Sequence, residues 1–390
     1  METFRRNNIE SVSQAKIAIV HDFLTQFGGA ERCLDALREI FPDAPVFTLL
    51  YDQKKLPQYK GCVRQTSYLQ SFPFWRRSHY VYFPFYQHAI EKFDLSEFDI
   101  VLTSSVNYAK GVLAPKAFHI CYCYTVPRFV YVMRDKYTDE YKGFLRAAIN
   151  RLIQRFEKWD MKARQRPDSY IAISRTVKER LKKYYGVNSS VVYPPVNVDH
   201  FVPGAENNDR AEYFLMVSRL KEYKNIEMAI LAFNQLGLNL KIVGEGNYAS
   251  HLKKLAGPNI NFLGWVDEKT LLNNYQRCRA LIVSGEEDFG LAGLEAQACG
   301  RPVIAFKKGG ACETVVENET GIFFEEATPN AIIDAVKRFE LSRFETDEIR
   351  KNALRFSKQQ FKMIIGELAR SEYENFKNKG NDVRVCKTIN

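Results

Sequence analysis

The chain has 390 residues, of which 46% are apolar and 26% charged, and its formal net charge is +10. This length allows two domains of ordinary size, each with its own core. Apolar runs such as 17–20 and 280–283 are as long as single strands, and no run approaches the roughly 18 or more apolar residues of a membrane-spanning helix.

Short apolar strands alternate with helical patterns along most of the chain. Residues 1–15 are polar and lack the apolar core of a signal peptide, so we expect a disordered tail there. A helix is predicted over 30–41, and strands are predicted at 16–20, 46–50, 99–103, 118–122, 169–173, 213–217, 240–243, 260–263, 280–283 and 302–306. Such short apolar runs between helices predict parallel sheets covered on both faces, hence two doubly wound α/β domains.

The predicted boundary between the domains lies near residues 194–212. Pro194 and Pro195 stiffen the backbone, and the stretch 203–210 has the composition of a polar linker. We therefore expect a first domain over 16–203 and a second over 204–365. The remainder, 366–390, is expected to form a helix that packs back on the first domain, followed by a tail.

The positive charge is confined to the first half. Residues 1–205 contain 30 Lys and Arg against 20 Asp and Glu, whereas the rest of the chain is balanced, so the first domain should face something anionic. Two stretches stand out: 72–86 holds eight aromatic residues with Arg76 and Arg77, and 110–166 is strongly basic. These patterns fit a membrane interface. They equally fit core aromatics beside a solvated cationic face.

The segment 284–322 carries the clearest chemical pattern. A strand ends at Ser284, acidic residues follow, and Gly290 is expected to open a helix, so that backbone N–H groups at Gly290 and Leu291 could receive a phosphate or a hydroxyl. Carboxylates suit adjacent sugar hydroxyls, because each oxygen accepts a hydrogen bond. Acidic residues that merely stabilise a helix N-terminus would explain Glu287 but not Glu295, two turns further on.

The sequence E-D-F-G-L-A-G-L-E at 287–295 resembles the E-x7-E motif of the retaining glycosyltransferases of family 4. The resemblance extends over roughly residues 16–378. It implies a metal-independent enzyme with the GT-B fold, in which two Rossmann-like domains face a cleft. It places Glu287 against the donor sugar, Glu295 against the ribose, and Phe289, Gly290 and Leu291 between them at the donor.

Two segments of the second half resemble other donor-binding parts of that family. Residues 218–224 resemble the loop whose Arg and Lys bind the donor pyrophosphate, which gives this role to Arg219 and Lys224. Fixed cations there would stabilise the charge that appears on the departing nucleotide, although a solvated basic loop is the alternative. Gly244 and Val266 lie in segments that resemble the nucleobase site, and the glycine could equally serve an ordinary turn.

In the first half, the loop 21–31 contains Gly28 and Gly29 and resembles the family's glycine loop, which faces the donor phosphates and the acceptor. It is not G-x-G-x-x-G, which weighs against a dinucleotide site. Relatives usually carry a donor-contacting histidine where this chain has Tyr124. We expect the Tyr124 hydroxyl to take over that contact with the transferred sugar.

No metal and no cofactor other than the donor substrate are expected. The chain has no acidic pair with metal-ligand spacing, its six histidines are scattered, and its eight cysteines form no CxxC pair. The motif region resembles mannosyltransferases of bacterial surface polysaccharide synthesis, which implies GDP-mannose as donor and a saccharide or lipid-linked saccharide as acceptor. A UDP-sugar donor and a sugar-nucleotide epimerase of the same fold are the alternatives.

The resemblance and the charge also imply where the protein is located and disfavour nucleic acid as a partner. We expect a cytoplasmic protein, or one peripheral to an anionic membrane at the cytoplasmic face. Nucleic-acid binding is disfavoured because the charge lies in one domain that has no recognisable binding module.

Overall fold

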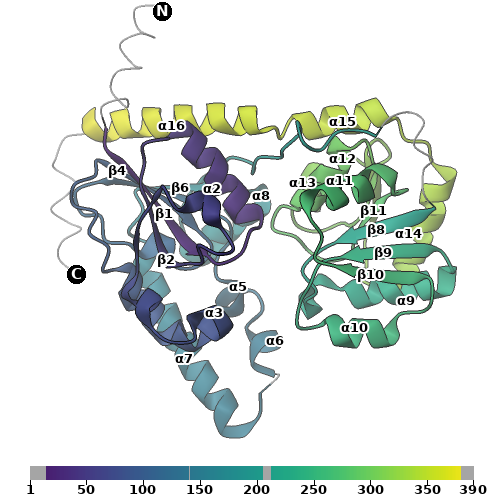
Figure 1. Ribbon diagram of the computed structural model, residues 1–390, viewed down its shortest axis with the longest axis horizontal. Coiled ribbons are helices and arrows are strands. Elements are labelled where there is room, and N and C mark those ends of the chain that lie inside the picture. The colour runs from purple at the N-terminus through teal and green to yellow at the C-terminus, as the bar shows by residue number, and fades with distance from the viewer. Residues whose placement is uncertain (1–14, 140, 205–211, 379–390) are drawn as a thin grey trace, which may run out of the picture. The chain divides into compact units, whose positions relative to one another are not determined.

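The computed structural model describes residues 15–139, 141–204 and 212–378, with the backbone alone for 77–80 and 136 (Figure 1). Residues 1–14 of the expected tail 1–15, the C-terminal residues 379–390 and most of the expected linker lie outside these ranges. The chain forms two compact units, one comprising the chain up to Val192 together with the residues from Lys362, and the other Tyr193–Phe361.

The first unit is built on a seven-stranded parallel sheet of order β3-β2-β1-β4-β5-β6-β7. Its strands are β1 Ile17–Leu24, β2 Val46–Tyr51, β3 Val63–Thr66, β4 Ile100–Ser105, β5 Phe118–Cys123, β6 Ser169–Ala172 and β7 Ser190–Val191. Its α-helices are α2 Gly29–Ile40, α3 Trp75–Ser78, α4 Phe83–Ile90, α5 Arg128–Tyr131, α6 Arg134–Asp139, α7 Gly143–Ala163 and α8 Arg175–Arg180. Single helical turns lie at η1 Pro57–Tyr59, η2 Tyr68–Ser71, η3 His79–Tyr82, η4 Ala109–Gly111 and η5 Leu181–Tyr185.

The second unit is built on a six-stranded parallel sheet of order β10-β9-β8-β11-β12-β13. Its strands are β8 Tyr213–Val217, β9 Asn239–Val243, β10 Ile260–Gly264, β11 Leu281–Val283, β12 Val303–Phe306 and β13 Gly321–Phe324. Its helices are α9 Ile226–Leu236, α10 Ala249–Leu255, α11 Glu268–Arg277, α12 Leu291–Ala298, α13 Ala311–Thr314, α14 Pro329–Leu341 and α15 Thr346–Leu354, with the short turn η6 Glu222–Lys224.

The apolar runs form strands because both faces of each sheet are covered. Every residue of β2, β4, β5, β12 and β13 is buried, as expected for parallel sheets between two layers of helices. The core of the first unit includes Phe47, Val101 and Phe156, and that of the second includes Phe214 and Phe233. The expected pair of doubly wound α/β domains is confirmed.

The segment that follows Val192 belongs to the second unit, eleven residues ahead of the boundary expected after residue 203. The Val196 N–H donates to the Phe356 carbonyl at 2.8 Å, and the Phe201 ring lies edge-on to Tyr275 at 5.6 Å between centroids. These contacts hold the Tyr193–Phe201 stretch to that unit. A polar linker further along the chain therefore does not mark the boundary.

The C-terminal helix α16 spans Lys358–Asn378, so it begins eight residues before the expected position. From Lys362 onward it belongs to the first unit. Lys362 pairs with Glu39 at 3.1 Å, and the Phe376 ring lies 4.9 Å from that of Phe118. Among the residues that the structure describes, no helix is long and apolar enough to cross a bilayer.

Candidate functional site

The carboxyl ends of β8 and β11 meet at the middle of the second sheet. β8 pairs with β9 on one side and with β11 on the other, so the crossover connections run in opposite directions from this point. In open α/β sheets such a switch point opens a crevice that binds ligands. The loop after β8 carries Arg219 and Lys224, and the loop after β11 carries Glu287.

Lys224 and Glu287, 63 positions apart in sequence, form an ion pair at this switch point. The Lys224 side chain is only 8% exposed and that of Glu287 25%. The main chain of Lys224 is also fixed, because the Ser284 hydroxyl donates to the Lys224 carbonyl at 2.9 Å. Two residues expected at the donor are thus brought together, and the ammonium group is held by the Glu287 carboxylate.

Arg219 lies on the same loop and is exposed to solvent. A nitrogen of its guanidinium lies 3.5 Å from the Tyr223 hydroxyl. The loop therefore presents one accessible cation and one buried cation. That combination can hold a diphosphate while keeping one charge in a region of low dielectric.

Three glycines that the sequence interpretation did not assign allow the loops at this edge to pack closely. A Cβ on Gly310 would lie 2.3 Å from the Phe289 backbone, and one on Gly285 would lie 2.7 Å from the Lys224 carbonyl. Gly309 forms a bridge with Glu287, to whose carbonyl the Gly310 N–H donates at 2.8 Å. The paired glycines at 309–310, separated by two residues from the end of the buried strand β12, were the sequence signal for this contact.

Helix α12 begins after Gly290, whose φ of 92° lies in the left-handed region that favours glycine. Leu291 is its first residue, so the N-terminus expected at this position is present. Glu295 is 7% exposed and accepts a hydrogen bond from the Tyr275 hydroxyl at 2.9 Å. One oxygen of its carboxylate is therefore already hydrogen-bonded within the second unit. The resemblance predicts that this same carboxylate contacts the ribose.

Phe289 is 3% exposed and packs away from solvent. Its ring stacks on Tyr193 at 5.5 Å and lies 5.8 Å from Phe356. Only its backbone can face a ligand, so the side chain anchors the motif loop to the core of the second unit.

The two segments expected at the nucleobase lie at the carboxyl ends of β9 and β10. Gly244 adopts φ 131°, and a Cβ there would lie 1.9 Å from the Ser218 carbonyl oxygen. This glycine is therefore required by the close approach of the loop that begins at Ser218. Val266 is half-buried, and the neighbouring Trp265 is 74% exposed.

In the first unit, Tyr124 points into the protein and joins a buried polar network. Its hydroxyl donates to the Ala30 carbonyl at 3.1 Å and lies 2.9 Å from the Ser104 hydroxyl. Ser104 in turn lies 2.9 Å from His21 Nδ1, and His21 Nε2 lies 3.5 Å from Glu31. Burial raises the pKa of Tyr124 well above its ordinary value, so the phenol stays protonated as a donor.

This geometry differs from the sugar contact expected of Tyr124. A residue that is 8% exposed and bonded to Ala30, within the first turn of α2, holds the start of that helix. Gly28 is the N-cap residue of α2, and Gly29 is its exposed first residue. The sequence showed that Tyr124 departs from the family pattern, but a pattern cannot show the direction in which a side chain points.

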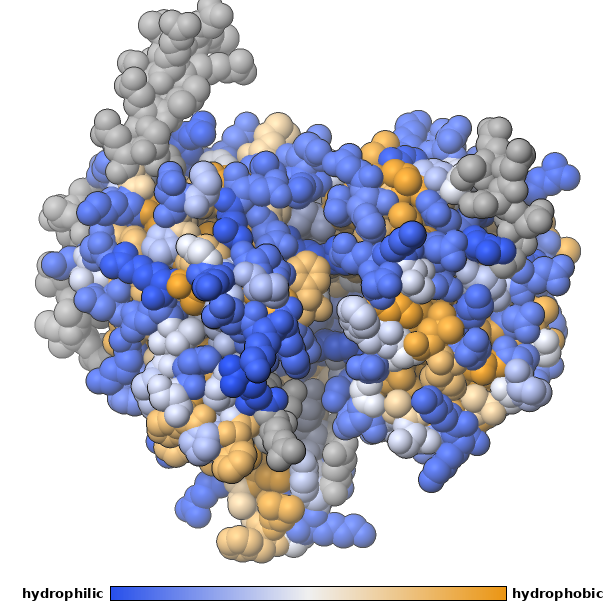
Figure 2. All heavy atoms as spheres, viewed as in Figure 1, coloured by the Kyte–Doolittle hydropathy of each residue, from blue (hydrophilic) through white to orange (hydrophobic). Residues whose placement is uncertain are grey.

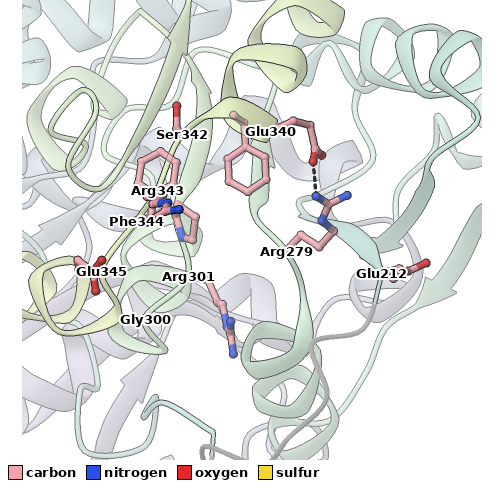
Figure 3. A pocket seen from close by; sticks show the side chains of 11 residues that line it. Glu212, Arg279, Gly300, Arg301, Glu340, Ser342, Arg343, Phe344 and Glu345 are labelled. Carbon is pink, nitrogen blue, oxygen red and sulfur yellow. Dashed lines mark hydrogen bonds and ion pairs between the residues drawn. The ribbon is translucent and has the colours of Figure 1, made fainter.

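A cavity of about 680 Å³ lies elsewhere in the second unit, at the amino-terminal ends of β8, β11 and β12 (Figure 3). It is lined by Glu212, Arg279, Gly300, Arg301, Pro302, Phe339, Glu340, Ser342, Arg343, Phe344 and Glu345. Its three arginines are matched by three glutamates, and Arg279 pairs with Glu340. It lies at the edge of the sheet opposite to Lys224 and Glu287.

Within the described ranges, no group of three or more His, Cys, Asp or Glu side chains could hold a metal ion.

Comparison with known families agrees with this geometry. The family described as Glycosyltransferase Family 4 matches residues 27–200, and the family described as Glycosyl transferases group 1 matches residues 199–356. The two matches overlap only at residues 199–200 and together cover most of both units. The chain belongs to the family 4 glycosyltransferases of GT-B fold.

The curated relatives of this chain differ in the activity that their names state. An uncharacterised glycosyltransferase of Methanocaldococcus jannaschii is 26% identical over 201 residues, covering 49% of this chain and 55% of the relative. A GDP-mannose-dependent α-(1-6)-phosphatidylinositol monomannoside mannosyltransferase of Mycobacterium tuberculosis is 30% identical over 200 residues, covering 44% and 52%. This chain spans about half the length of the curated relatives it matches.

Solved structures show that this family 4 chain shares the GT-B fold. Anabaena HepE, in complex with UDP and glucose, superposes with a TM-score of 0.68 at 17% identity, covering 92% of this chain and all of HepE. Sucrose-phosphate synthase of Thermosynechococcus elongatus gives 0.69 at 17% identity, with the same coverage.

Proposed function

We propose that this chain is a retaining, metal-independent glycosyltransferase that moves a hexose from a nucleotide sugar to a saccharide or lipid-linked saccharide. The observation that carries the proposal is the Lys224–Glu287 pair at the switch point of the second sheet. It joins a fixed cation to the first glutamate of the motif, next to the exposed Arg219.

Bond cleavage at the donor leaves negative charge on the nucleotide diphosphate. Arg219 and Lys224 would stabilise that charge, and the N-terminus of α12 at Gly290 would add backbone N–H groups. Lys224 needs no reorganisation to do so, because Glu287 and the Ser284 hydroxyl already hold its loop. The buried Lys224 and the exposed Arg219 would together supply the positive charge at the diphosphate.

Retention follows if the acceptor hydroxyl enters from the face that the diphosphate leaves. The departing phosphate can then accept the acceptor's proton while the sugar passes through an oxocarbenium-like state. Glu287, with its carboxylate engaged by Lys224, would orient the donor sugar.

GDP-mannose is the donor that we propose first, and the GDP-mannose-dependent relative supports it. A UDP-sugar is the second candidate, supported by the neighbour solved with UDP and glucose. The cationic first unit would bind the acceptor, and an anionic membrane surface would carry that acceptor.

Thermal unfolding with GDP, UDP and ADP tests the donor site, because a ligand that binds only the folded state raises Tm by mass action. We expect GDP to raise Tm in the wild type and in Lys351→Ala, which removes an exposed lysine of α15. Lys224→Ala should reduce the shift, because it removes a charged partner of the diphosphate. If UDP alone raises Tm, the GDP-mannose assignment is wrong.

Product analysis tests the reaction itself. Transfer from GDP-mannose in the presence of a chelator, with the anomeric configuration read by NMR, would support metal independence and retention. No response to any of the three nucleotides, together with no transfer from either donor, would refute the transferase. Release of an isomerised sugar nucleotide without acceptor would indicate an epimerase.

A further inference from the structure

The amino-terminal end of α7 leaves apolar side chains uncovered. Phe144 is 90% exposed and Leu145 is 55% exposed. Further along the same helix, Ile153 and Phe156 are buried in the core of the first unit. Residues three or four apart share one helix face. The apolar face that is buried at Ile153 and Phe156 therefore continues toward the amino-terminal end of α7, where the core no longer covers it. In Figure 1 this end of α7 projects away from the sheet of its unit.

A second group of exposed apolar residues lies on the segment that packs beside α7. Phe74, Val81 and Phe85 are 71%, 60% and 50% exposed. This segment is joined to α7 where Phe83, on α4, stacks on Phe156 at 5.5 Å. Figure 2 shows hydrophobic residues gathered at the projecting end of α7 and on the neighbouring surface of the same unit. Soluble surfaces seldom gather large apolar side chains in this way unless something covers them.

The same end of α7 is cationic. From Lys142 to Phe156 the chain carries Lys142, Arg146, Arg151 and Arg155 and no acidic residue, and all four cations are exposed. Arg146 pairs with the exposed Asp139, a contact that water and salt readily replace. Apolar side chains ringed by cations match the boundary between acyl chains and anionic headgroups.

We propose that this end of α7 docks on an anionic phospholipid bilayer. Phe144 and Leu145 enter the headgroup boundary, and the four cations lie over lipid phosphates. A second copy of the chain fits less well, because two cationic ends would repel each other. The proposal deepens the proposed function by naming the surface on which the acceptor is met, but lipid binding itself requires no sugar transfer.

Vesicle sedimentation of the full chain tests the docking surface. Vesicles of phosphatidylcholine alone are compared with vesicles containing about one-third phosphatidylglycerol, at low and high salt. We expect binding to the anionic vesicles that is stronger by about tenfold or more and weakens with salt. Equal recovery on both vesicles would overturn the proposal.

Variants distinguish docking through the amino-terminal end of α7 from a general effect of the positive net charge. Phe144→Ser/Leu145→Ser should reduce anionic-vesicle binding about tenfold, and Arg146→Gln/Arg151→Gln/Arg155→Gln should reduce it about a hundredfold at low salt. The control Leu341→Ser removes a residue of the second unit that is 89% exposed and should bind as the wild type does. Binding unchanged in the first two variants, or a loss of self-association in sedimentation velocity instead, would overturn the proposal.

Nucleotide-induced thermal shifts on the same proteins keep the two proposals distinguishable. Loss of vesicle binding with an unchanged shift supports docking through α7. A wild type that binds vesicles but responds to no nucleotide leaves the docking surface in place and counts against the donor site alone. Variants that unfold at the wild-type temperature exclude misfolding as the cause.

Discussion

Removing the Tyr124 hydroxyl should weaken the first unit more than it weakens the chemistry. Tyr124→Phe deletes the hydrogen bond to the Ala30 carbonyl and the one shared with Ser104. Each neutral hydrogen bond contributes about 0.5–1.5 kcal/mol, so we expect the free energy of unfolding to fall by about 1–3 kcal/mol. For a unit of this size each kcal/mol lowers Tm by about 2–4 °C.

Turnover should fall only about two- to tenfold, because the start of α2 loosens while no contact to the reacting sugar is lost. Tyr124→Ala also opens a cavity and should cost about 3–5 kcal/mol. Unfolding is followed by circular dichroism, and steady-state kinetics are measured with the identified donor at a temperature where both proteins are folded.

Ser104→Ala provides the matched control. It removes the shared hydrogen bond from the other side, so the double variant should lose less stability than the sum of the single variants. An unchanged Tm in Tyr124→Phe combined with a turnover loss far above tenfold would refute this reasoning, since the hydroxyl would then contact the sugar. A strong gain of activity in Tyr124→His would mean that the natural tyrosine weakens the enzyme.

Further predictions concern the second unit and pH. Lys224→Ala and Glu295→Ala should each weaken nucleotide binding by more than about tenfold, measured by calorimetry, because each removes a charged partner of the donor. Glu295→Ala should also destabilise the unit, since it leaves the Tyr275 hydroxyl without its 2.9 Å acceptor; near wild-type binding in both variants would remove the assigned site. Gly310→Ala should lower the free energy of unfolding by about 1–3 kcal/mol and reduce turnover, because its Cβ would overlap the motif backbone; wild-type values in both measurements would contradict the tight loop. Burial raises the pKa of Tyr122 and Tyr185 well above their ordinary values and raises those of Cys33 and Cys278 to about 12, so stability should fall as pH rises through about 8.5 to 10, where these groups ionise only in the unfolded chain; urea titrations from pH 7 to 11 would test this, and constant stability up to pH 11 would contradict it.

Much of the fold was readable from the sequence because parallel strands between two helical layers must be apolar throughout. Runs such as 118–122 and 302–306 therefore predicted strands directly. The strands missed, β3, β7 and β13, are edge strands of their sheets, and β3 and β7 are short and not fully buried. A local pattern does not show whether such a segment joins a sheet.

The sequence by itself determined the chemical types and their order: a cationic loop after the first strand of the second half, then the spaced glutamates after its fourth. Only the tertiary structure decided which of them meet. Lys224 and Glu287 are joined because β8 and β11 are neighbours at the switch point, a pairing that depends on strand order and not on sequence distance. Tyr124 points inward for a related reason, since the tertiary structure brings its hydroxyl within hydrogen-bonding distance of the Ala30 carbonyl and the Ser104 hydroxyl, both distant in sequence.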